Sequence, residues 1–148
     1  MRAIVNRKAK FEYQFLQTFE AGIVLSGPEV KSLRLGNANL SDAFCYFRNH
    51  ELYMRNMHIA EYNMATDQVQ DTKRERKLLL KKAELRKLER KTKEKGLSIV
   101  PFKIFFNDRG FVKVMIALGQ GKKSYDKRET IKERDTKRDL QRIKKIRL

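Results

Sequence analysis

Residues 98–119 have the sequence SIVPFKIFFNDRGFVKVMIALG. β-Branched and aromatic residues fill residues 98–106 and 111–119, which is a composition typical of strands. The segment 107–110 between them is a turn in which Gly110 can take a positive φ. Residues 98–119 therefore predict an antiparallel hairpin, with Lys103 and Lys113 on its solvent side.

Further strands are expected before this hairpin. Residues 11–25 are dense in Phe, Tyr, Ile and Val and predict one long strand or two joined strands, with a bend at Gly22. Residues 44–48 and 51–55 predict a second hairpin, and residues 56–64 predict another strand or an irregular edge. Short antiparallel strands with a few helices favour an α+β fold, mainly β, whose sheet closes into a small barrel.

Two helices are predicted from start and stop signals. Ser26, Pro28 and Glu29 mark the start of a short helix that Gly36 ends. A capping-box pattern at residues 72–75 and leucines at helical spacing predict a second helix of about 20 residues before Gly96. Most of the circumference of this second helix carries Lys and Arg.

Positive charge is concentrated in three segments. The 148-residue chain carries 35 Lys and Arg against 18 Asp and Glu, which is a net charge of +17. Residues 1–10, 73–95 and 120–148 contain 28 of the bases and 9 of the acids, or +19, so the remainder is −2. This segregation predicts a polyanion partner, most commonly nucleic acid. The alternative is that the basic runs are only solvated faces.

Several function classes lack the residues that they need. Cys45 is the lone cysteine, which excludes an intrachain disulfide and a zinc site of several thiolates. The sequence has no phosphate-binding glycine loop and no nucleophile–His–Asp set, and its two histidines lack metal-ligand spacing. It also has neither a secretory signal nor an apolar run approaching about 18 residues. We therefore expect a cytoplasmic protein that is not an enzyme, with no metal, cofactor or membrane contact.

The composition changes after the predicted hairpin. Residues 119–121, Gly-Gln-Gly, predict a hinge, and residues 122–148 carry too little apolar surface for a core. We expect a folded domain over residues 1–121 and a basic tail over residues 122–148 that is disordered when free. The tail has no Gly or Pro, so it is able to become helical when a partner binds it.

Ordered motifs along nearly the whole chain resemble one known family. They are Asn6–Lys10 followed by Phe11–Tyr13, Phe19–Gly22, Glu29–Arg34 with Gly36, Ser41-Asp42, Arg76–Leu80, Gly121–Lys123 and Asp126–Arg128. In order and spacing they resemble the small protein B family, the SsrA-binding proteins. The resemblance implies a six-stranded antiparallel barrel of the OB type with about three helices.

The resemblance also implies partners. Members of this family are monomeric RNA-binding proteins that bind the tRNA-like domain of transfer-messenger RNA, where they replace an anticodon stem. Together the protein and the RNA enter stalled ribosomes, and translation resumes on the RNA's own reading frame, which is called trans-translation. By this resemblance, we expect transfer-messenger RNA and the ribosome as partners in ribosome rescue.

The family's RNA-binding set corresponds by motif to Asn6, Arg7, Lys8, Tyr13, Glu20, Leu79, Lys113, Lys122 and Lys123. The lysines are able to neutralise phosphates, which supplies affinity without sequence identity. Tyr13 either stacks on an unpaired base or packs internally, and Leu79 either packs on a nucleobase or belongs to the core. Asn6 and Glu20 either hydrogen-bond to base or ribose groups or brace the N-terminal arm.

The same resemblance assigns part of the tail to the ribosome. The assigned residues are Asp126, Lys127, Arg128, Ile131 and Ile143. Our hypothesis is that the tail becomes helical in the message channel next to the small-subunit decoding region. A channel that still holds message would exclude it, so the tail would test for an empty channel.

Two other readings of the sequence stay open. A structural ribosomal protein with basic tails has the same composition, and only the ordered motifs favour a rescue factor over it. An enzyme that acts on RNA is disfavoured, because the acids outside the basic segments show no metal-binding pattern.

Overall fold

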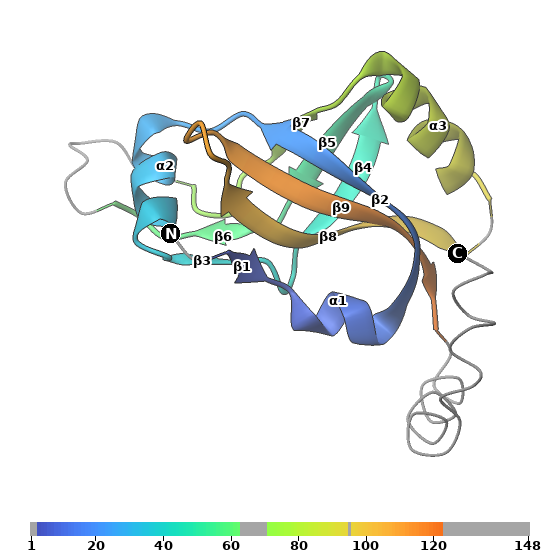
Figure 1. Ribbon diagram of the computed structural model, residues 1–148, viewed down its shortest axis with the longest axis horizontal. Helices are drawn as coiled ribbons and strands as arrows, with labels where there is room; N and C mark the ends of the chain where they lie inside the picture. The colour runs from blue at the N-terminus through green and yellow to red at the C-terminus, as the bar shows by residue number, and fades with distance from the viewer. Residues whose placement is uncertain (1–2, 63–70, 95, 123–148) are drawn as a thin grey trace.

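The computed structural model describes residues 3–62, 71–94 and 96–122, and its elements are labelled in Figure 1. In this part of the chain, seven strands form an antiparallel sheet with the order β1 (Ile4–Val5), β8 (Leu97–Phe106), β9 (Val112–Gly121), β2 (Tyr13–Ile23), β7 (Arg76–Leu79), β5 (Glu51–Arg55) and β4 (Phe44–Arg48). A separate pair joins β3 (Ala38–Asn39) to β6 (His58–Ile59). The helices are α1 (Arg7–Glu12), α2 (Gly27–Arg34) and α3 (Lys82–Thr92).

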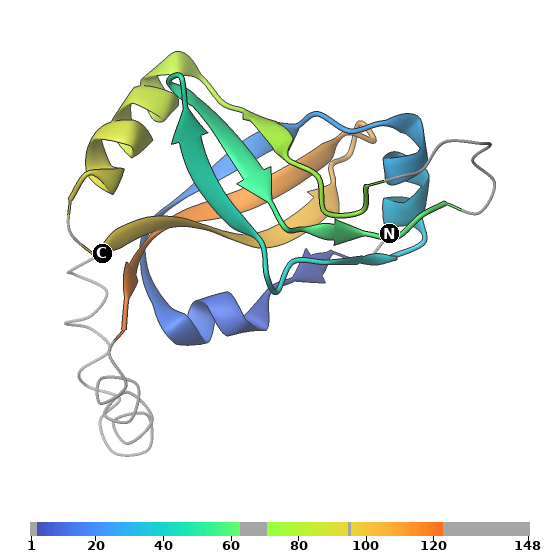
Figure 2. The same cartoon turned by 180° about the vertical axis from the view of Figure 1, so that it is seen from behind.

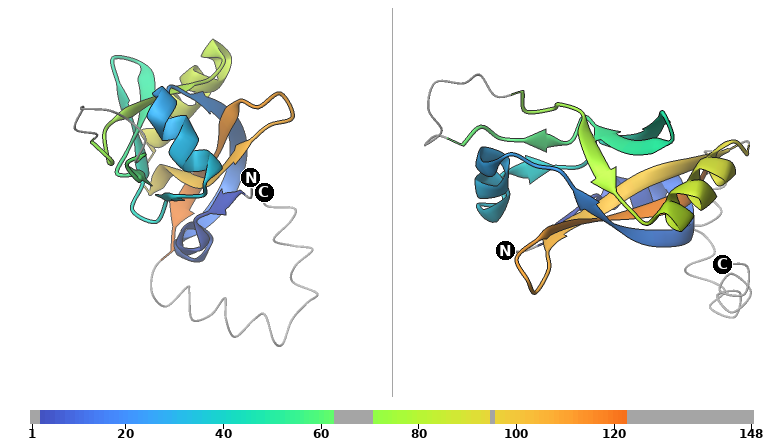
Figure 3. Two further views of the ribbon diagram at one scale, coloured as in Figure 1. Left: turned by 90° about the vertical axis from the view of Figure 1, so that its left-hand side faces the viewer. Right: turned by 90° about the horizontal axis from the view of Figure 1, so that it is seen from above.

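The sheet curls into a barrel around one core. The long strand β2 pairs with both β9 and β7, and β4 lies against β8, which brings the two sides of the sheet together. Figures 2 and 3 show β4 and β5 on the opposite side of the barrel from β2, with α2 across one end and α3 at the other. Buried side chains from the sheet and from α2 and α3 fill the interior. The predicted α+β, mainly β fold with three helices is confirmed.

The hairpin predicted from residues 98–119 is the β8–β9 pair. Ile104 pairs with Val114, and both side chains are fully buried. The turn contains Gly110 at a φ of 84°, as its sequence indicates. Lys103 and Lys113 lie at positions that alternate with the buried ones, on the outer face of the sheet.

The prediction of a single long helix before Gly96 is wrong. Residues 76–79 form β7, and α3 has only 11 residues. The helix begins after Lys81, whose backbone N–H donates to Glu84 at 3.2 Å, so the cap lies nine residues beyond Thr72. The reason is tertiary: β7 alternates buried and less buried side chains and pairs with β2 and β5. Leucine spacing alone does not carry this long-range pairing.

The basic N-terminal segment contains β1 and α1. One expectation near the end of the barrel is corrected. The predicted hinge at residues 119–121 is part of β9, where Gly119 pairs with Phe15 and Gly121 with Tyr13. A Cβ on Gly119 would lie 3.1 Å from the Tyr13 Cβ, so this glycine permits close packing rather than bending.

The predicted start of α2 is confirmed as a capping box. The Glu29 backbone N–H donates to the Ser26 hydroxyl at 3.3 Å, and the Ser26 N–H donates to the Glu29 carboxylate at 2.8 Å. This cap leaves the Glu29 carboxylate at the edge of the barrel with capacity for further donors.

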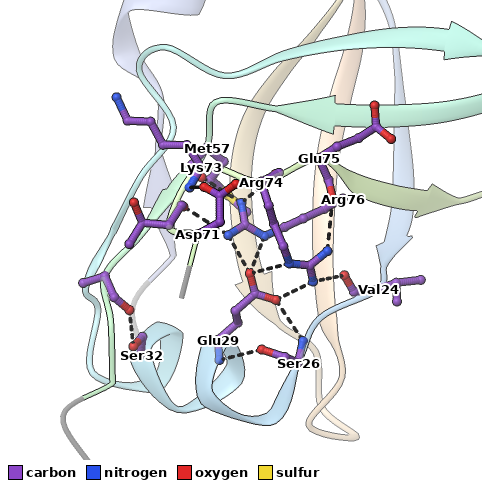
Figure 4. Close-up of polar contacts among 12 residues, drawn as sticks. Val24, Ser26, Glu29, Ser32, Met57, Asp71, Lys73, Arg74, Glu75 and Arg76 are labelled. Atoms are coloured by element: carbon purple, nitrogen blue, oxygen red, sulfur yellow. Dashed lines mark hydrogen bonds and ion pairs between the residues drawn. The ribbon is translucent and has the colours of Figure 1, made fainter. Parts of the chain in front are cut away.

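A buried ion cluster ties this cap to β7 (Figure 4). Glu29 accepts from Arg76 Nε at 2.7 Å and from Arg74 Nη2 at 2.6 Å. Arg76, whose side chain is fully buried, also donates to the carbonyl oxygens of Met57 at 2.8 Å and Thr72 at 3.1 Å. The cluster therefore joins α2, the β5–β6 connection and the segment leading into β7.

The charge of Glu29 depends on these donors. Burial raises the pKa of this carboxyl group, but hydrogen bonds from Arg74, the Ser26 amide and Arg76 outweigh it and hold the pKa below its ordinary value of 4.5. Since the pKa is depressed in the folded state, the stabilisation is present above pH 4.5 and is lost as the pH falls through the folded-state pKa.

We expect Glu29→Gln to lower the free energy of unfolding at pH 7 by about 3 kcal/mol, because it leaves the buried Arg76 guanidinium without a counter-charge. Urea unfolding between pH 7 and pH 3 measures the effect, and the difference from wild type should shrink below about pH 4.5. The control is Glu94→Gln, whose partner Lys91 is a surface residue, with an expected change below about 0.5 kcal/mol. Equal stability of Glu29→Gln and wild type at pH 7 would contradict this account.

Candidate nucleic-acid interface

Four residues form a row across the outer face of the sheet. Leu79 of β7 pairs with Gly22 of β2, Gly22 pairs with Lys113 of β9, and Lys113 pairs with Phe105 of β8. Leu78, Val114 and Ile104, which alternate with them along their strands, are buried in the core. The row is therefore displayed on the outside of the barrel.

Gly22 adds no side chain between Leu79 and Lys113 in this row. A Cβ at this position would lie 3.3 Å from the Leu79 Cβ, so any larger residue would press against that side chain. Leu79 is 50% exposed. This exposure rules out the predicted alternative that Leu79 belongs to the core. An apolar side chain this exposed beside a lysine is able to cover a planar group such as a nucleobase.

A second row runs beside the first and contains an acidic residue. Glu20 of β2 pairs with Met115 of β9, which pairs with Lys103 of β8. The Lys103 ammonium lies 5.3 Å from the centre of the Phe105 ring. The Glu20 side chain is exposed and makes no hydrogen bond or ion pair with any other described residue. Its carboxylate is therefore free to accept hydrogen bonds from a ligand.

The residues predicted near the N-terminus lie around α1. Asn6 is buried and caps this helix, with its Oδ1 accepting from the Ala9 N–H at 3.3 Å and its Nδ2 donating to the Leu40 carbonyl at 3.1 Å. It therefore braces the segment, which was one of its predicted alternatives. Arg7 and Lys8 are exposed on the first turn, and Lys8 pairs with Glu12 at 3.8 Å.

Tyr13 lies where α1, β2 and the end of β9 meet. Its side chain packs over Gly119, and it lines an open cleft of about 410 Å³ together with Asn6 and Lys8. The next residue after β9, Lys122, donates its backbone N–H to the Glu12 carbonyl at 2.9 Å. The chain thus leaves the barrel beside Tyr13. The other predicted site residues, Lys123, Asp126, Lys127, Arg128, Ile131 and Ile143, lie outside the described residues.

The predicted residues thus form two groups, one towards each end of β2. Glu20, Leu79 and Lys113 lie together, and Tyr13 is seven positions from Glu20 along β2, or about 23 Å. Between them, the Phe15 and Phe102 rings are 4.9 Å apart, and the Lys10 ammonium is 6.0 Å from the Phe102 ring. Phe15, Phe102 and Phe105 were missed from the sequence, because their outward direction depends on strand register.

This surface alternates cations with aromatic and apolar side chains. Such an arrangement suits phosphates and exposed bases. Among residues 3–62, 71–94 and 96–122, no group of three or more His, Cys, Asp or Glu side chains is placed to hold a metal ion. None of the helices in those ranges is long and apolar enough to cross a membrane.

Comparisons with known proteins identify the family of this chain. Two similar chains are the SsrA-binding proteins of Christiangramia forsetii, 54% identical over 96% of this chain and 90% of the relative, and of Chlorobaculum tepidum, 51% identical over 97% and 91%. A solved chain from the structure described as "tmRNA-SmpB: a journey to the center of the bacterial ribosome" matches with a TM-score of 0.71 and 45% identity, over 88% of this chain and 95% of that one. The model of the SmpB protein family matches residues 3–146. This chain therefore belongs to the SmpB protein family.

Proposed function

We propose that this protein binds the tRNA-like domain of transfer-messenger RNA and brings it to stalled ribosomes for trans-translation. Membership of the SmpB family and the names of the relatives support this function. The observation that carries it is the outer sheet face, where Glu20, Leu79 and Lys113 lie together on three neighbouring strands. The protein acts by binding RNA and catalyses no reaction, and it works in the cytoplasm.

The three residues of this face have different tasks. Lys113 neutralises a backbone phosphate, which adds affinity for any RNA. Leu79 packs its exposed side chain on an unstacked base or a ribose. Glu20 supplies identity, since a carboxylate only accepts hydrogen bonds and therefore needs base N–H or ribose O–H donors.

Because Glu20 is negatively charged, the direction of the change in RNA affinity on its removal tests its role. A carboxylate repels phosphates, so its removal should strengthen RNA binding if charge alone drives association. If Glu20 accepts hydrogen bonds from particular donors, its removal should weaken binding to the right RNA only. The two accounts thus predict opposite changes from one substitution.

The second group extends the same interface along β2. Arg7 and Lys8 on the exposed turn of α1 neutralise phosphates, while Asn6 acts from below by holding α1 in place. Tyr13 contributes the free part of its ring to the RNA from the position where it packs on Gly119. Lys122 and Lys123 continue the basic surface as the chain leaves the barrel.

Residues 1–121 thus form the RNA-binding domain, and residues 122–148 form the ribosome-binding tail.

The tail serves the second partner. Asp126, Lys127 and Arg128 contact the ribosome near the decoding region, and Ile131 and Ile143 provide the apolar points of the tail. The tail becomes helical in an empty message channel. With a rise of 1.5 Å per residue, 27 helical residues span about 40 Å of channel.

We expect Glu20→Ala to weaken binding of the tRNA-like domain about 10- to 150-fold, because hydrogen bonds to a charged group contribute about 1.5–3 kcal/mol. Binding to a random RNA duplex should stay equal or become slightly tighter. Fluorescence anisotropy with both RNAs at the same salt concentration measures the two effects.

The matched control for this substitution is Glu94→Ala, which removes an equal charge from the end of α3 and should shift both affinities alike. Tighter binding of the tRNA-like domain by Glu20→Ala would contradict the assigned role.

For the tail, we expect the full-length double variant Lys127→Glu, Arg128→Glu to bind the tRNA-like domain within about threefold of wild type, because the barrel face is unchanged. Tagging of the stalled chain on ribosomes with an empty message channel should fall at least tenfold, because two phosphate contacts become repulsive. Tagging at the wild-type rate would overturn the role given to the tail.

A further inference from the structure

The solvent face of α3 carries a continuous basic stripe. Lys82, Arg86, Arg90 and Lys93 are all exposed and succeed one another at spacings of four, four and three residues. At 100° and 1.5 Å per residue, the four side chains fall within an arc of about 80° and span about 17 Å along the axis. The opposite face packs Leu88, which is fully buried, on the core. The orientation of the stripe is therefore fixed by the core.

The acids around the stripe all have other partners. Glu84 accepts from the Lys81 N–H at 3.2 Å, Glu89 contacts His50 at 3.0 Å, and Glu94 pairs with Lys91 at 3.4 Å.

The four stripe residues themselves have no acidic partner among the described residues. Glu89 is three residues from Arg86 and four from Lys93, and Glu94 is four residues from Arg90, but the two carboxylates contact His50 and Lys91 instead. Within the stripe, the spacings of three and four residues that usually pair opposite charges bring cations together. Repulsion among four neighbouring cations is relieved when a polyanion binds.

The stripe continues the surface already described. Leu79 ends β7, and Lys82 begins α3 three residues later, so their Cα atoms are at most about 11 Å apart. The other end of α3 is next to the place where the chain leaves the barrel, because the Gly121 N–H donates to the Gly96 carbonyl at 3.2 Å. Figure 1 shows α3 at the same end of the barrel as the start of β8 and the end of β9. The stripe thus links the Leu79 surface with the Lys122 exit.

We propose that the α3 stripe is an additional RNA-binding surface that holds the phosphate backbone of the same tRNA-like domain. This inference rests on the proposed function and extends the contact beyond the sheet. The stripe reads no sequence, since cations on a rigid helix contact phosphates rather than base edges. Its contribution is affinity and the orientation of the RNA across the α3 end of the barrel.

The test uses the full-length double variant Arg86→Gln, Arg90→Gln and the purified tRNA-like domain over a range of salt concentrations. If two phosphate contacts are lost, the log–log salt slope should flatten by about 1.4–1.8, which weakens binding about 15- to 30-fold at 0.15 M salt. The variant Arg86→Lys, Arg90→Lys should keep the wild-type slope, because either cation neutralises a phosphate.

The matched control is Arg55→Gln, Arg109→Gln, which removes the same charge from two other exposed positions. The proposal requires that this control changes the slope by less than about 0.5. Circular dichroism spectra and thermal unfolding of all variants exclude loss of α3.

Two outcomes overturn the proposal. One is an equal change in slope for the stripe variant and the control, which would show only the effect of net charge. The other is an unchanged slope on the isolated RNA with weaker binding to stalled ribosomes, which would assign the stripe to ribosomal RNA. Failure of the proposed function itself looks different, since wild-type protein would then not distinguish the tRNA-like domain from a random duplex.

Discussion

The ion cluster of Glu29, Arg74 and Arg76 is the interaction on which the exposed surfaces depend. Glu29 belongs to the cap of α2, while the two arginines precede the residues that pair β7 with β2. Arg76 also holds the Met57 carbonyl, so one guanidinium links three parts of the chain. The cluster therefore sets where β7 lies on β2, and with it the position of Leu79 and the start of α3. Its polar atoms are paired, as burial of charge requires.

Side chains alternate between the two faces of each strand, and this alternation separates the residues that pack in the core from those that are available for binding. One face of β2, β7 and β9 fills the barrel, and the other presents a lysine, a leucine and a carboxylate around a glycine. Cations give affinity for the backbone of any RNA, so discrimination depends on groups such as Glu20 that would oppose binding unless the right donors face them. In the roles proposed for them, the basic stripe of α3 and the tail add affinity without reading sequence.

Much of this arrangement could be predicted from the sequence, because it rests on local signals. The β8–β9 hairpin, its glycine turn and the capped start of α2 follow from residue type and spacing. The segment 72–95 could not be predicted in this way. Its leucines have helical spacing, but residues 76–79 form a strand because they pair with β2 and β5. The outward direction of Phe15 and Phe102 depends on bulges that shift register, which residue alternation does not show. Asn6, assigned by resemblance to RNA, is a buried cap whose Nδ2 donates to carbonyl groups 34 and 95 residues away.

The most direct test of the central claim is a competition experiment at about 150 mM salt, where binding driven by charge alone is weak. Labelled tRNA-like domain of transfer-messenger RNA is bound to the full-length protein and challenged with excess unlabelled tRNA or random RNA duplex. The account predicts that the duplex leaves the complex intact, because the sheet face recognises the shape and donors of one RNA. Complete displacement by the duplex would contradict it and reduce the protein to a general polyanion binder, for which an embedded ribosomal protein is the better description.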